Sequence, residues 1–189
     1  MARKPRNKPN AEFHHITNRG ASRNDIYRDP VDHAIFLQLL DRANLKFEMA
    51  IHAFCLMGNH YHLLAQFPHR NMPTAMHWIG TCYSIAFNRK YGTDGRLCRD
   101  RYFNKPIEDE AYLITVARYI HQNPKAYGLQ DFSSYEASSY RVYLGEETRP
   151  PWLSTDLVLG FFNNDELLLR AYMDAIPNAD IEVPARYTA

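Results

Sequence analysis

The chain has 189 residues, of which 46% are hydrophobic and 23% charged, so it can bury a core and form one domain of ordinary size rather than a disordered chain. Its apolar runs end well short of the roughly 18 residues that a membrane-spanning helix needs, and no apolar stretch of a secretory signal follows the basic start. Three cysteines without a CxxC pair argue against a disulfide framework or a zinc knuckle, so we expect a cytoplasmic protein with no membrane partner.

The formal net charge of +1 conceals an uneven distribution along the chain. Residues 1–105 carry 16 Lys and Arg against 8 Asp and Glu, whereas residues 106–189 carry 6 against 13. Such a split favours one surface built for an anion such as nucleic acid. The alternative, in which both signs interleave on the folded surface and cancel, stays open at this point.

The first part of the chain predicts an arm, a strand and a long helix. Residues 1–10 are basic and contain proline, so we expect a flexible arm. Residues 13–17 are a candidate strand, and the polar residues 18–25 are a candidate loop. Asp29 and the proline after it predict a helix start, and apolar residues at helical spacing extend the helix over residues 30–46.

A β-hairpin and a second helix are predicted next. Residues 49–57 and 61–67 are apolar strand candidates, and Gly58 with Asn59 supplies the turn between them. Asn71 predicts the cap of a helix over residues 72–91.

The last part of the chain predicts one more strand and several helices. Residues 101–107 are a candidate strand, and the acids at 108–110 open a third helix that Pro124 closes. Residues 125–153 are expected to be loop-like with one short helix, and residues 154–174 to form one or two small helices.

The order strand, helix, strand, strand, helix, strand is that of a ferredoxin-like α+β sandwich, in which two helices cover one face of an antiparallel sheet. We therefore expect three segments: a basic flexible arm over residues 1–10, the main domain over residues 11–149, and an acidic C-terminal helical extension over residues 150–189.

His60 and His62 are the first candidate functional pair. Two histidines two positions apart on a strand project from the same face, so their imidazoles can converge on one metal ion. The plain alternative is that one histidine faces solvent while the other packs under the covering helices. Their position beside a turn favours an accessible site.

Tyr119 and Asn123 are the second candidate pair. Tyr119 lies off the apolar stripe of the third predicted helix, and Asn123 follows one turn later on the same face. A phenol and an amide side by side can supply a nucleophile and a ligand. Alternatively, the tyrosine lies at the domain rim and the asparagine caps the helix.

Basic residues interleaved with aromatic ones are the third candidate feature, because cations meet phosphates and rings stack on unpaired bases. A solvated loop is the alternative. The predicted DNA-binding residues are Arg3, Lys4, Arg6, Lys8, Arg19, Arg23, Arg96, Arg99, Arg101 and Lys105.

Taken together, five motifs resemble the HUH single-tyrosine transposases, and most of all the branch called REP-associated tyrosine transposases. They are residues 14–20 (HHITNRG), 56–64 (LMGNHYHLL), 95–102 (GRLCRDRY), 112–124 ending in RYIHQNP, and 138–140 (SSY). The resemblance covers roughly residues 10–145 in the right order and spacing. The chain departs from the family pattern at Tyr61, where an aliphatic residue is usual, and at Gly58, where proline is common.

This resemblance implies a metal-dependent enzyme that cuts and rejoins single-stranded DNA, often at hairpin-forming sequences. Tyr119 would be the catalytic nucleophile and would form a 5′-phosphotyrosine. His60, His62 and Asn123 would be ligands of a divalent metal ion, Mg²⁺ or Mn²⁺. The implied partners are single-stranded or hairpin DNA and, because subunits of the family can join their sheets, a second copy of the chain in a homodimer.

Two other functions remain open from the residues alone. The first is a hairpin-DNA-binding protein without catalytic activity, which the intact His60, His62, Tyr119 and Asn123 disfavour. The second is an unrelated metallohydrolase with Zn²⁺ on the histidine pair, for which no third histidine or carboxylate stands at a standard spacing.

Overall fold

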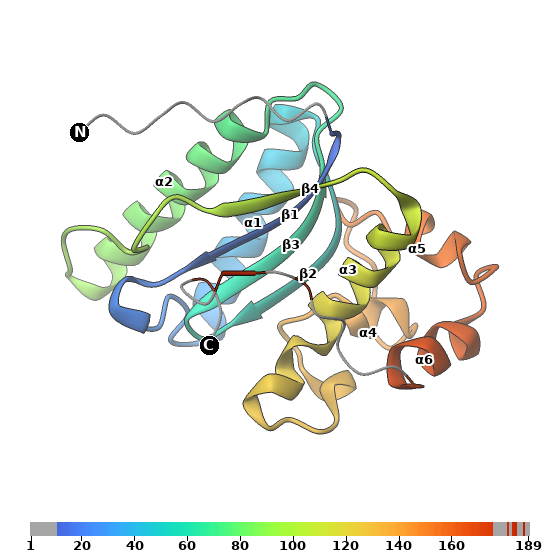
Figure 1. Cartoon of the computed structure of the whole chain (residues 1–189). Helices are drawn as coiled ribbons and strands as arrows, with labels where there is room; N and C mark the ends of the chain where they lie inside the picture. The colour runs from blue at the N-terminus through green and yellow to red at the C-terminus, as the bar shows by residue number, and fades with distance from the viewer. Residues whose placement is uncertain (1–10, 176–180, 182, 185–186, 188–189) are drawn as a thin grey trace.

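The computed structural model describes residues 11–175, 181, 183–184 and 187, so the arm predicted over residues 1–10 lies outside the described residues. A four-stranded antiparallel sheet in the order β2-β3-β1-β4 forms the centre (Figure 1). The strands are β1 (Phe13–Arg19), β2 (Ala50–Met57), β3 (His60–Gln66) and β4 (Phe103–Ile107). With α1 (Pro30–Phe47) after β1 and α2 (Met72–Tyr91) after β3, the predicted ferredoxin-like α+β order is confirmed.

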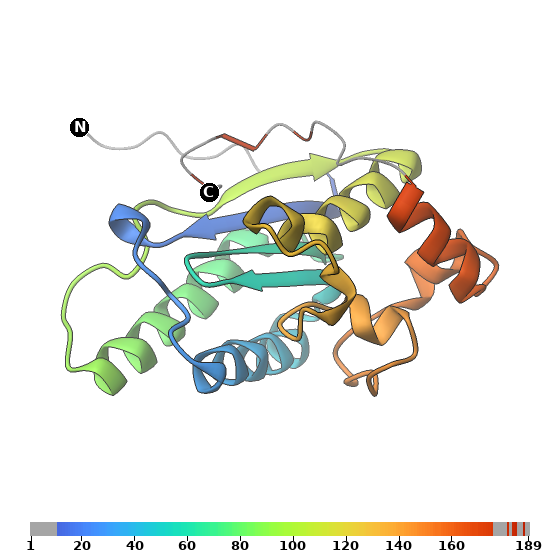
Figure 2. The same cartoon turned by 90° about the horizontal axis from the view of Figure 1, so that it is seen from below.

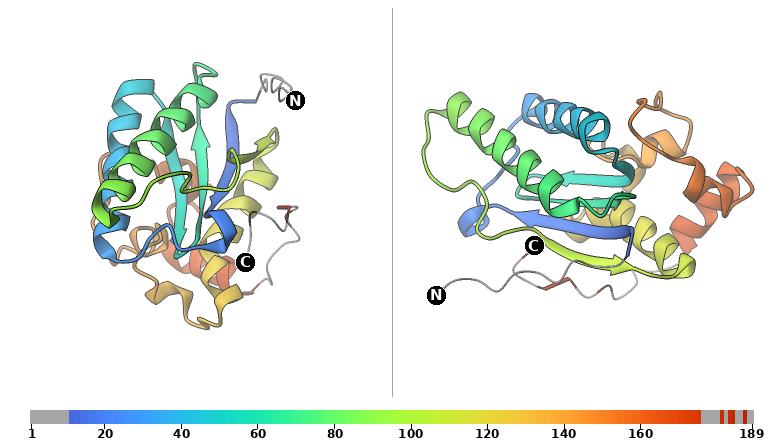
Figure 3. Two further views of the ribbon diagram at one scale, coloured as in Figure 1. Left: turned by 90° about the vertical axis from the view of Figure 1, so that its left-hand side faces the viewer. Right: turned by 90° about the horizontal axis from the view of Figure 1, so that it is seen from above.

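The helices α1 and α2 cover one face of the sheet, as predicted (Figures 2 and 3). The Asp29 carboxylate accepts a hydrogen bond from the Asp32 N–H and caps α1, and Pro30 occupies its first turn. The apolar stripe of α1, which includes Phe36 and Leu40, is buried in the main core. Burial of this stripe against the sheet, rather than helix propensity alone, stabilises α1.

Two local predictions are wrong. Asn71 precedes α2, but its side chain does not cap that helix: its amide donates to the Phe47 carbonyl, 2.7 Å away, and ties α2 to the end of α1. The loop predicted over residues 18–25 begins later, because β1 continues to Arg19, which pairs with His60.

The strands β2 and β3 form the predicted hairpin, with Met57 paired to His60 across a two-residue turn. Because side chains alternate along a strand, the two faces of β3 differ in chemistry. Tyr61 belongs to the core under α1 and α2, whereas Leu64 packs into a second core on the other face. His60 and His62 share the face of Leu64.

The second face is covered by α3 (Glu110–Gln122), whose N-terminus is capped by the Asp109 carboxylate through the Tyr112 N–H. The helical C-terminal region adds α4 (Tyr140–Tyr143), α5 (Asp156–Gly160) and α6 (Glu166–Ala175). The short 3₁₀ helices are η1 (Ala21–Arg23), η2 (Asn123–Tyr127) and η3 (Phe132–Ser134). Within the described part of the chain, no helix has both the length and the apolar composition needed to cross a bilayer.

Later parts of the chain cover the outer edge of β2. The Leu56 N–H donates to the Ala137 carbonyl at 2.8 Å, and the Ser154 N–H donates to the Ile51 carbonyl at 2.9 Å. The start of the extension predicted over residues 150–189 therefore packs on the sheet, and the domain boundary at its start remains a prediction. A second sheet cannot pair with β2 at these backbone positions.

Candidate active site

His60 and His62 lie together on the face of β3 that α3 covers. Their ring centroids are 5.1 Å apart and the rings are nearly perpendicular. Each residue is at most 1% exposed, so neither histidine faces solvent, and the alternative with one exposed imidazole is wrong. The structure therefore places two buried imidazoles beside the β2–β3 turn.

The end of α3 brings Tyr119 and Asn123 to this histidine pair. Asn123 Oδ1 lies 3.3 Å from His60 Nε2, and the ring centroids of Tyr119 and His62 are 5.4 Å apart. The Asn123 side chain also lies next to Tyr119 and acts to lower the pKa of its phenol. Although Asn123 occupies the helix C-cap position, its side chain points to His60. All four predicted side chains thus meet in one cluster.

His15, on β1, completes this cluster, although no pattern in the sequence assigns it a role. Its Nε2 lies 3.0 Å from His62 Nδ1, and its ring makes an edge contact with the ring of Tyr119 at 5.6 Å. His15 is fully buried. The signal in the sequence was a histidine on a predicted strand, but only the pairing of β1 with β3 shows which side chain it meets.

The cluster fits a metal ion by the chemistry of its donors. His62 Nε2 is buried and has no hydrogen-bond partner among the described residues. His60 Nε2 and Asn123 Oδ1 converge beside it, which leaves two imidazoles and one amide oxygen as donors. No group of three or more His, Cys, Asp or Glu side chains is placed to hold a metal ion in the described residues, so the third donor at this site would be the amide oxygen of Asn123. These donors leave coordination positions that substrate oxygens or water can fill.

Burial keeps the histidines of the cluster neutral. It lowers the pKa of His60 to about 4 and that of His15 to about 3. Burial also lowers the pKa of His62 far below its usual value, and the neighbouring imidazoles lower it further. Neutral imidazole is the form that binds a metal ion, so these nitrogens need not lose a proton first.

Tyr119 is half-buried and protonated at neutral pH. Burial raises its pKa, and the neighbouring Asn123 side chain opposes this effect. The phenol is therefore reachable from outside but must lose its proton before or during attack on an electrophile.

His60 is held on its other side as well. Its Nδ1 lies 2.7 Å from Asn59 Oδ1 and 3.3 Å from the Tyr127 hydroxyl. A proton on Nδ1 that donates to the Asn59 oxygen leaves the lone pair on Nε2, facing Asn123. The shorter contact, with Asn59 Oδ1, favours the tautomer that a metal ligand needs, whereas the longer contact with Asn123 Oδ1 is a hydrogen bond only when Nε2 carries the proton.

Two of the predicted DNA-binding residues lie on the sheet face that carries the cluster. Arg19 pairs with His60 across β1 and β3 and is only 3% exposed, so its side chain is part of the site wall rather than of an open surface. Lys105, on β4, pairs with His15, and its ammonium lies 4.9 Å from the ring centroid of Tyr112.

The other described arginines of the predicted set are exposed. Arg23 lies in η1, and Arg96, Arg99 and Arg101 lie in the segment 95–102, which runs beside the end of β1. The Arg99 N–H donates to the Arg19 carbonyl at 3.2 Å, and this bond holds the segment there. The remaining predicted residues, Arg3, Lys4, Arg6 and Lys8, lie outside the described residues.

Comparisons with known proteins identify a matching family and a solved structure with a similar fold. A family model described as "Transposase IS200 like" matches residues 10–123, the stretch that contains the whole histidine, tyrosine and asparagine cluster. A solved structure, that of a REP-associated tyrosine transposase bound to a REP hairpin, is similar with a TM-score of 0.64. The similarity covers 83% of this chain and 93% of that chain at 14% sequence identity, and it supports the fold. No curated protein matches.

Proposed function

Because the chain belongs to the IS200-like transposase family, we propose that it cuts and rejoins single-stranded DNA with Tyr119 as the nucleophile. The observation that carries this proposal is the meeting of Tyr119, on α3, and Asn123, at the C-terminal end of that helix, with His60 and His62, from β3, in one cluster. A structural role alone does not require a half-buried phenol beside a buried imidazole nitrogen that has no partner among the described residues.

The proposed substrate is DNA that forms a hairpin next to an unpaired segment. The structurally similar transposase is bound to a REP hairpin, which supports this choice. The exposed Arg23, Arg96, Arg99 and Arg101 supply positive charge around the end of β1 that suits a phosphate backbone.

His60, His62 and Asn123 would hold a divalent cation, Mg²⁺ or Mn²⁺, which when bound would polarise the scissile phosphate and stabilise the charge that develops on it. Two imidazoles and one amide oxygen suit Mn²⁺ better than Mg²⁺, which prefers an all-oxygen environment.

In the proposed reaction the phenolic oxygen of Tyr119 forms a bond to phosphorus, and the bond from phosphorus to the 3′ oxygen of the leaving strand breaks. The phenol loses one proton and the 3′ oxygen gains one, so the products are a 5′-phosphotyrosine and a free 3′-hydroxyl. Attack by a 3′-hydroxyl on the phosphotyrosine reverses these steps and rejoins DNA. The phosphodiester energy is kept in the covalent intermediate, so no nucleotide cofactor is needed.

The other side chains position these reactants. Asn123 touches both Tyr119 and His60, so the position of the nucleophile and that of the ligand nitrogens are coupled. His15 packs against both His62 and Tyr119 and holds the two rings at a fixed separation. The burial of this cluster limits access of water, which would compete with the 3′-hydroxyl for the phosphotyrosine.

The test is formation of a covalent protein–DNA adduct. Labelled hairpin DNA with an unpaired flank is incubated with the protein and Mn²⁺, and the mixture is separated on a denaturing gel. Tyr119→Phe should abolish the adduct, whereas Tyr112→Phe, on the same helix, should keep it. An adduct that persists in Tyr119→Phe refutes the assignment. DNA binding with no adduct for any hairpin would instead indicate a binding protein without catalysis.

A homodimer joined through the sheets is also part of the proposed function, and the fold restricts how it can form. Residues 137–139 and Ser154 hydrogen-bond to β2, so joining through β2 would displace the chain's own segments. A sheet-to-sheet dimer would therefore have to use the β4 edge.

A further inference from the structure

A groove of about 930 Å³ lies between α2 and the segment 95–102, on the face of the sheet opposite the histidine cluster. Met76, Leu97 and Tyr102 contribute apolar surface to it. Its described lining carries three arginines, Arg96, Arg99 and Arg101, and one acid, Asp100, whose carboxylate lies 4.0 Å from Arg99 Nε. The groove thus combines apolar surface with a basic rim.

Gly80 lies in the middle of α2 and lines this groove. A Cβ placed on Gly80 would meet no atom of the described chain within 4 Å, so no close packing inside the protein requires a glycine there. Glycine weakens a helix relative to alanine or leucine. With a glycine at this position, the helix backbone itself forms part of the groove wall.

The groove and the catalytic cluster lie on the two sides of one strand. Asn18 lines the groove, whereas Thr17, the preceding residue in β1, pairs with His62 and points to the cluster side. The segment 95–102 hydrogen-bonds beside the end of β1 and leads directly into β4, which carries Lys105 on the cluster side. Basic side chains therefore continue around the sheet edge from one face to the other.

We infer that this groove binds a few unpaired nucleotides of the DNA strand that flanks the cleavage site. Their phosphates would meet Arg96, Arg99 and Arg101, and their bases would lie on the apolar surface beside Tyr102. Unpaired bases are required because a duplex keeps its bases stacked inside and would offer the groove only its backbone. The inference rests on the proposed function, since it places one part of that substrate.

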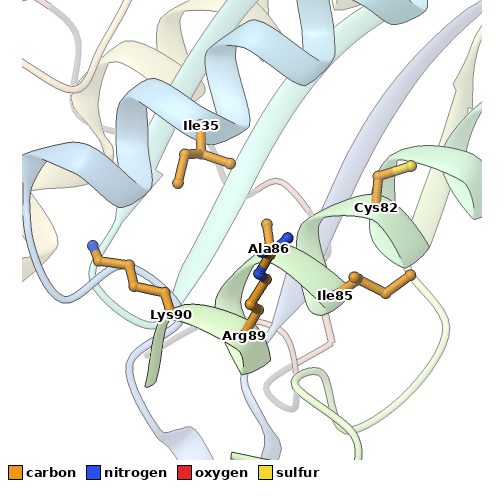
Figure 4. A pocket seen from close by; sticks show the side chains of 6 residues that line it. All are labelled: Ile35, Cys82, Ile85, Ala86, Arg89 and Lys90. Atoms are coloured by element: carbon orange, nitrogen blue, oxygen red, sulfur yellow. The ribbon is translucent and has the colours of Figure 1, made fainter. Parts of the chain in front are cut away.

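A second hollow, of about 640 Å³ between α1 and α2, does not share this chemistry (Figure 4). Of its two cations, Lys90 is bound by Asp29 and Asp32, each at 2.7 Å, which leaves Arg89. Arg89 is an exposed arginine on the same helix as Gly80, but it lines only this second hollow. It therefore provides a matched control for the arginines of the groove.

The experiment measures binding of fluorescein-labelled oligo(dT) of about ten nucleotides, a length within the range that single-strand-binding folds cover. Gly80→Leu fills the groove. It should weaken binding at least tenfold while leaving the melting temperature at or above that of the wild type.

Changing Arg96, Arg99 and Arg101 together to Gln should weaken binding. It should also reduce the slope of log K against log salt by about 2, since each lost phosphate contact on a single strand removes about 0.7. Arg89→Gln should change neither quantity.

Wild-type affinity in a folded Gly80→Leu protein would overturn the inference, and so would an Arg89→Gln effect as large as that of the triple variant. Adduct formation on hairpin DNA, measured in the same samples, separates this result from the proposed chemistry. Tyr119→Phe should lose the adduct and still bind oligo(dT) as the wild type does. If the wild type binds oligo(dT) in the groove but forms no adduct, the chemistry fails and the groove inference stands.

Discussion

His15 Nε2 lies 3.0 Å from His62 Nδ1, and the two buried rings stack with their centroids 5.3 Å apart. Two neutral imidazoles at this distance share one proton between the facing nitrogens. If His62 Nε2 is to present its lone pair to a metal ion, Nδ1 must carry the proton and donate to His15. His15 would then select the tautomer of His62, as the hydrogen-bond partners of metal-binding histidines commonly do.

His15→Phe should therefore weaken Mn²⁺ binding by about 10–100-fold, because it keeps the ring but removes the acceptor for the His62 proton. His15→Gln should recover part of the affinity, since its amide oxygen can accept the same proton. Titration calorimetry with Mn²⁺ checks both. His14→Gln is the control, because His14 faces the other side of β1 and lies near Phe67. Unchanged affinity in His15→Phe would contradict this role.

Asn123→Ala should slow adduct formation by about 100-fold, because loss of the amide frees the positions of both Tyr119 and the His60 nitrogen. Asn123→Gln should retain more activity than Asn123→Ala because it keeps an amide oxygen. Single-turnover gel assays give the rates. Thr115→Ala removes an exposed hydroxyl bonded to the Ala111 carbonyl of α3 and should leave the rate unchanged. Equal rates for the wild type and Asn123→Ala would refute the coupling.

The sequence predicted the elements well because their signals are local. The Asp29 cap, the two-residue turn between β2 and β3, and the apolar periodicities each depend on neighbouring residues. The spacing of Tyr119 and Asn123 likewise placed both on one side of a helix. These signals singled out the two pairs, and the resemblance to the HUH transposases joined them into one candidate site.

Contacts between segments that lie far apart in the sequence could not be predicted from local patterns. His15 was missed because its contact with His62 depends on the register of β1 against β3, which no local pattern specifies. Arg19 looked like an exposed loop residue for the same reason, since pairing with His60 extends the strand and buries it. The groove could not be predicted because it depends on the path of the segment 95–102. The periodicity of α3 likewise does not indicate which face of the sheet this helix covers.

His121 predicts a pH dependence of stability that is separate from metal binding. Burial lowers its pKa in the folded protein to about 3, below the value of about 6.5 expected in the unfolded chain. Between these values the unfolded chain binds more protons, so His121 alone should contribute up to about 1.4 kcal/mol per pH unit to the rise in the free energy of unfolding, a contribution that levels off above about pH 6.5. The buried histidines of the cluster add to this slope.

His121→Gln removes this titrating group, so the free energy of unfolding should depend less steeply on pH than in the wild type. Urea unfolding between about pH 4 and pH 7 measures both slopes. The exposed His69, bonded to Glu48 at the surface, provides the control variant His69→Gln, which should keep the wild-type slope. Identical slopes for all three proteins would exclude His121 as a source of the pH dependence.

Ser139 ties α3 to β2 on the side of the helix away from the histidine cluster. Its hydroxyl lies 2.8 Å from His121 Nε2 and accepts the Phe54 N–H at 2.9 Å, all three groups being buried. Ser139→Ala leaves both partners without this bond, so we expect a loss of about 1–3 kcal/mol in the free energy of unfolding. Ser84→Ala, which removes an exposed hydroxyl on α2, should change it by less than about 0.5 kcal/mol. Urea unfolding at neutral pH measures the stability of both variants.

Because His121 lies between Tyr119 and Asn123 in the sequence, Ser139→Ala should also slow adduct formation under conditions where the variant is fully folded. A wild-type rate in that folded variant would limit Ser139 to a role in stability.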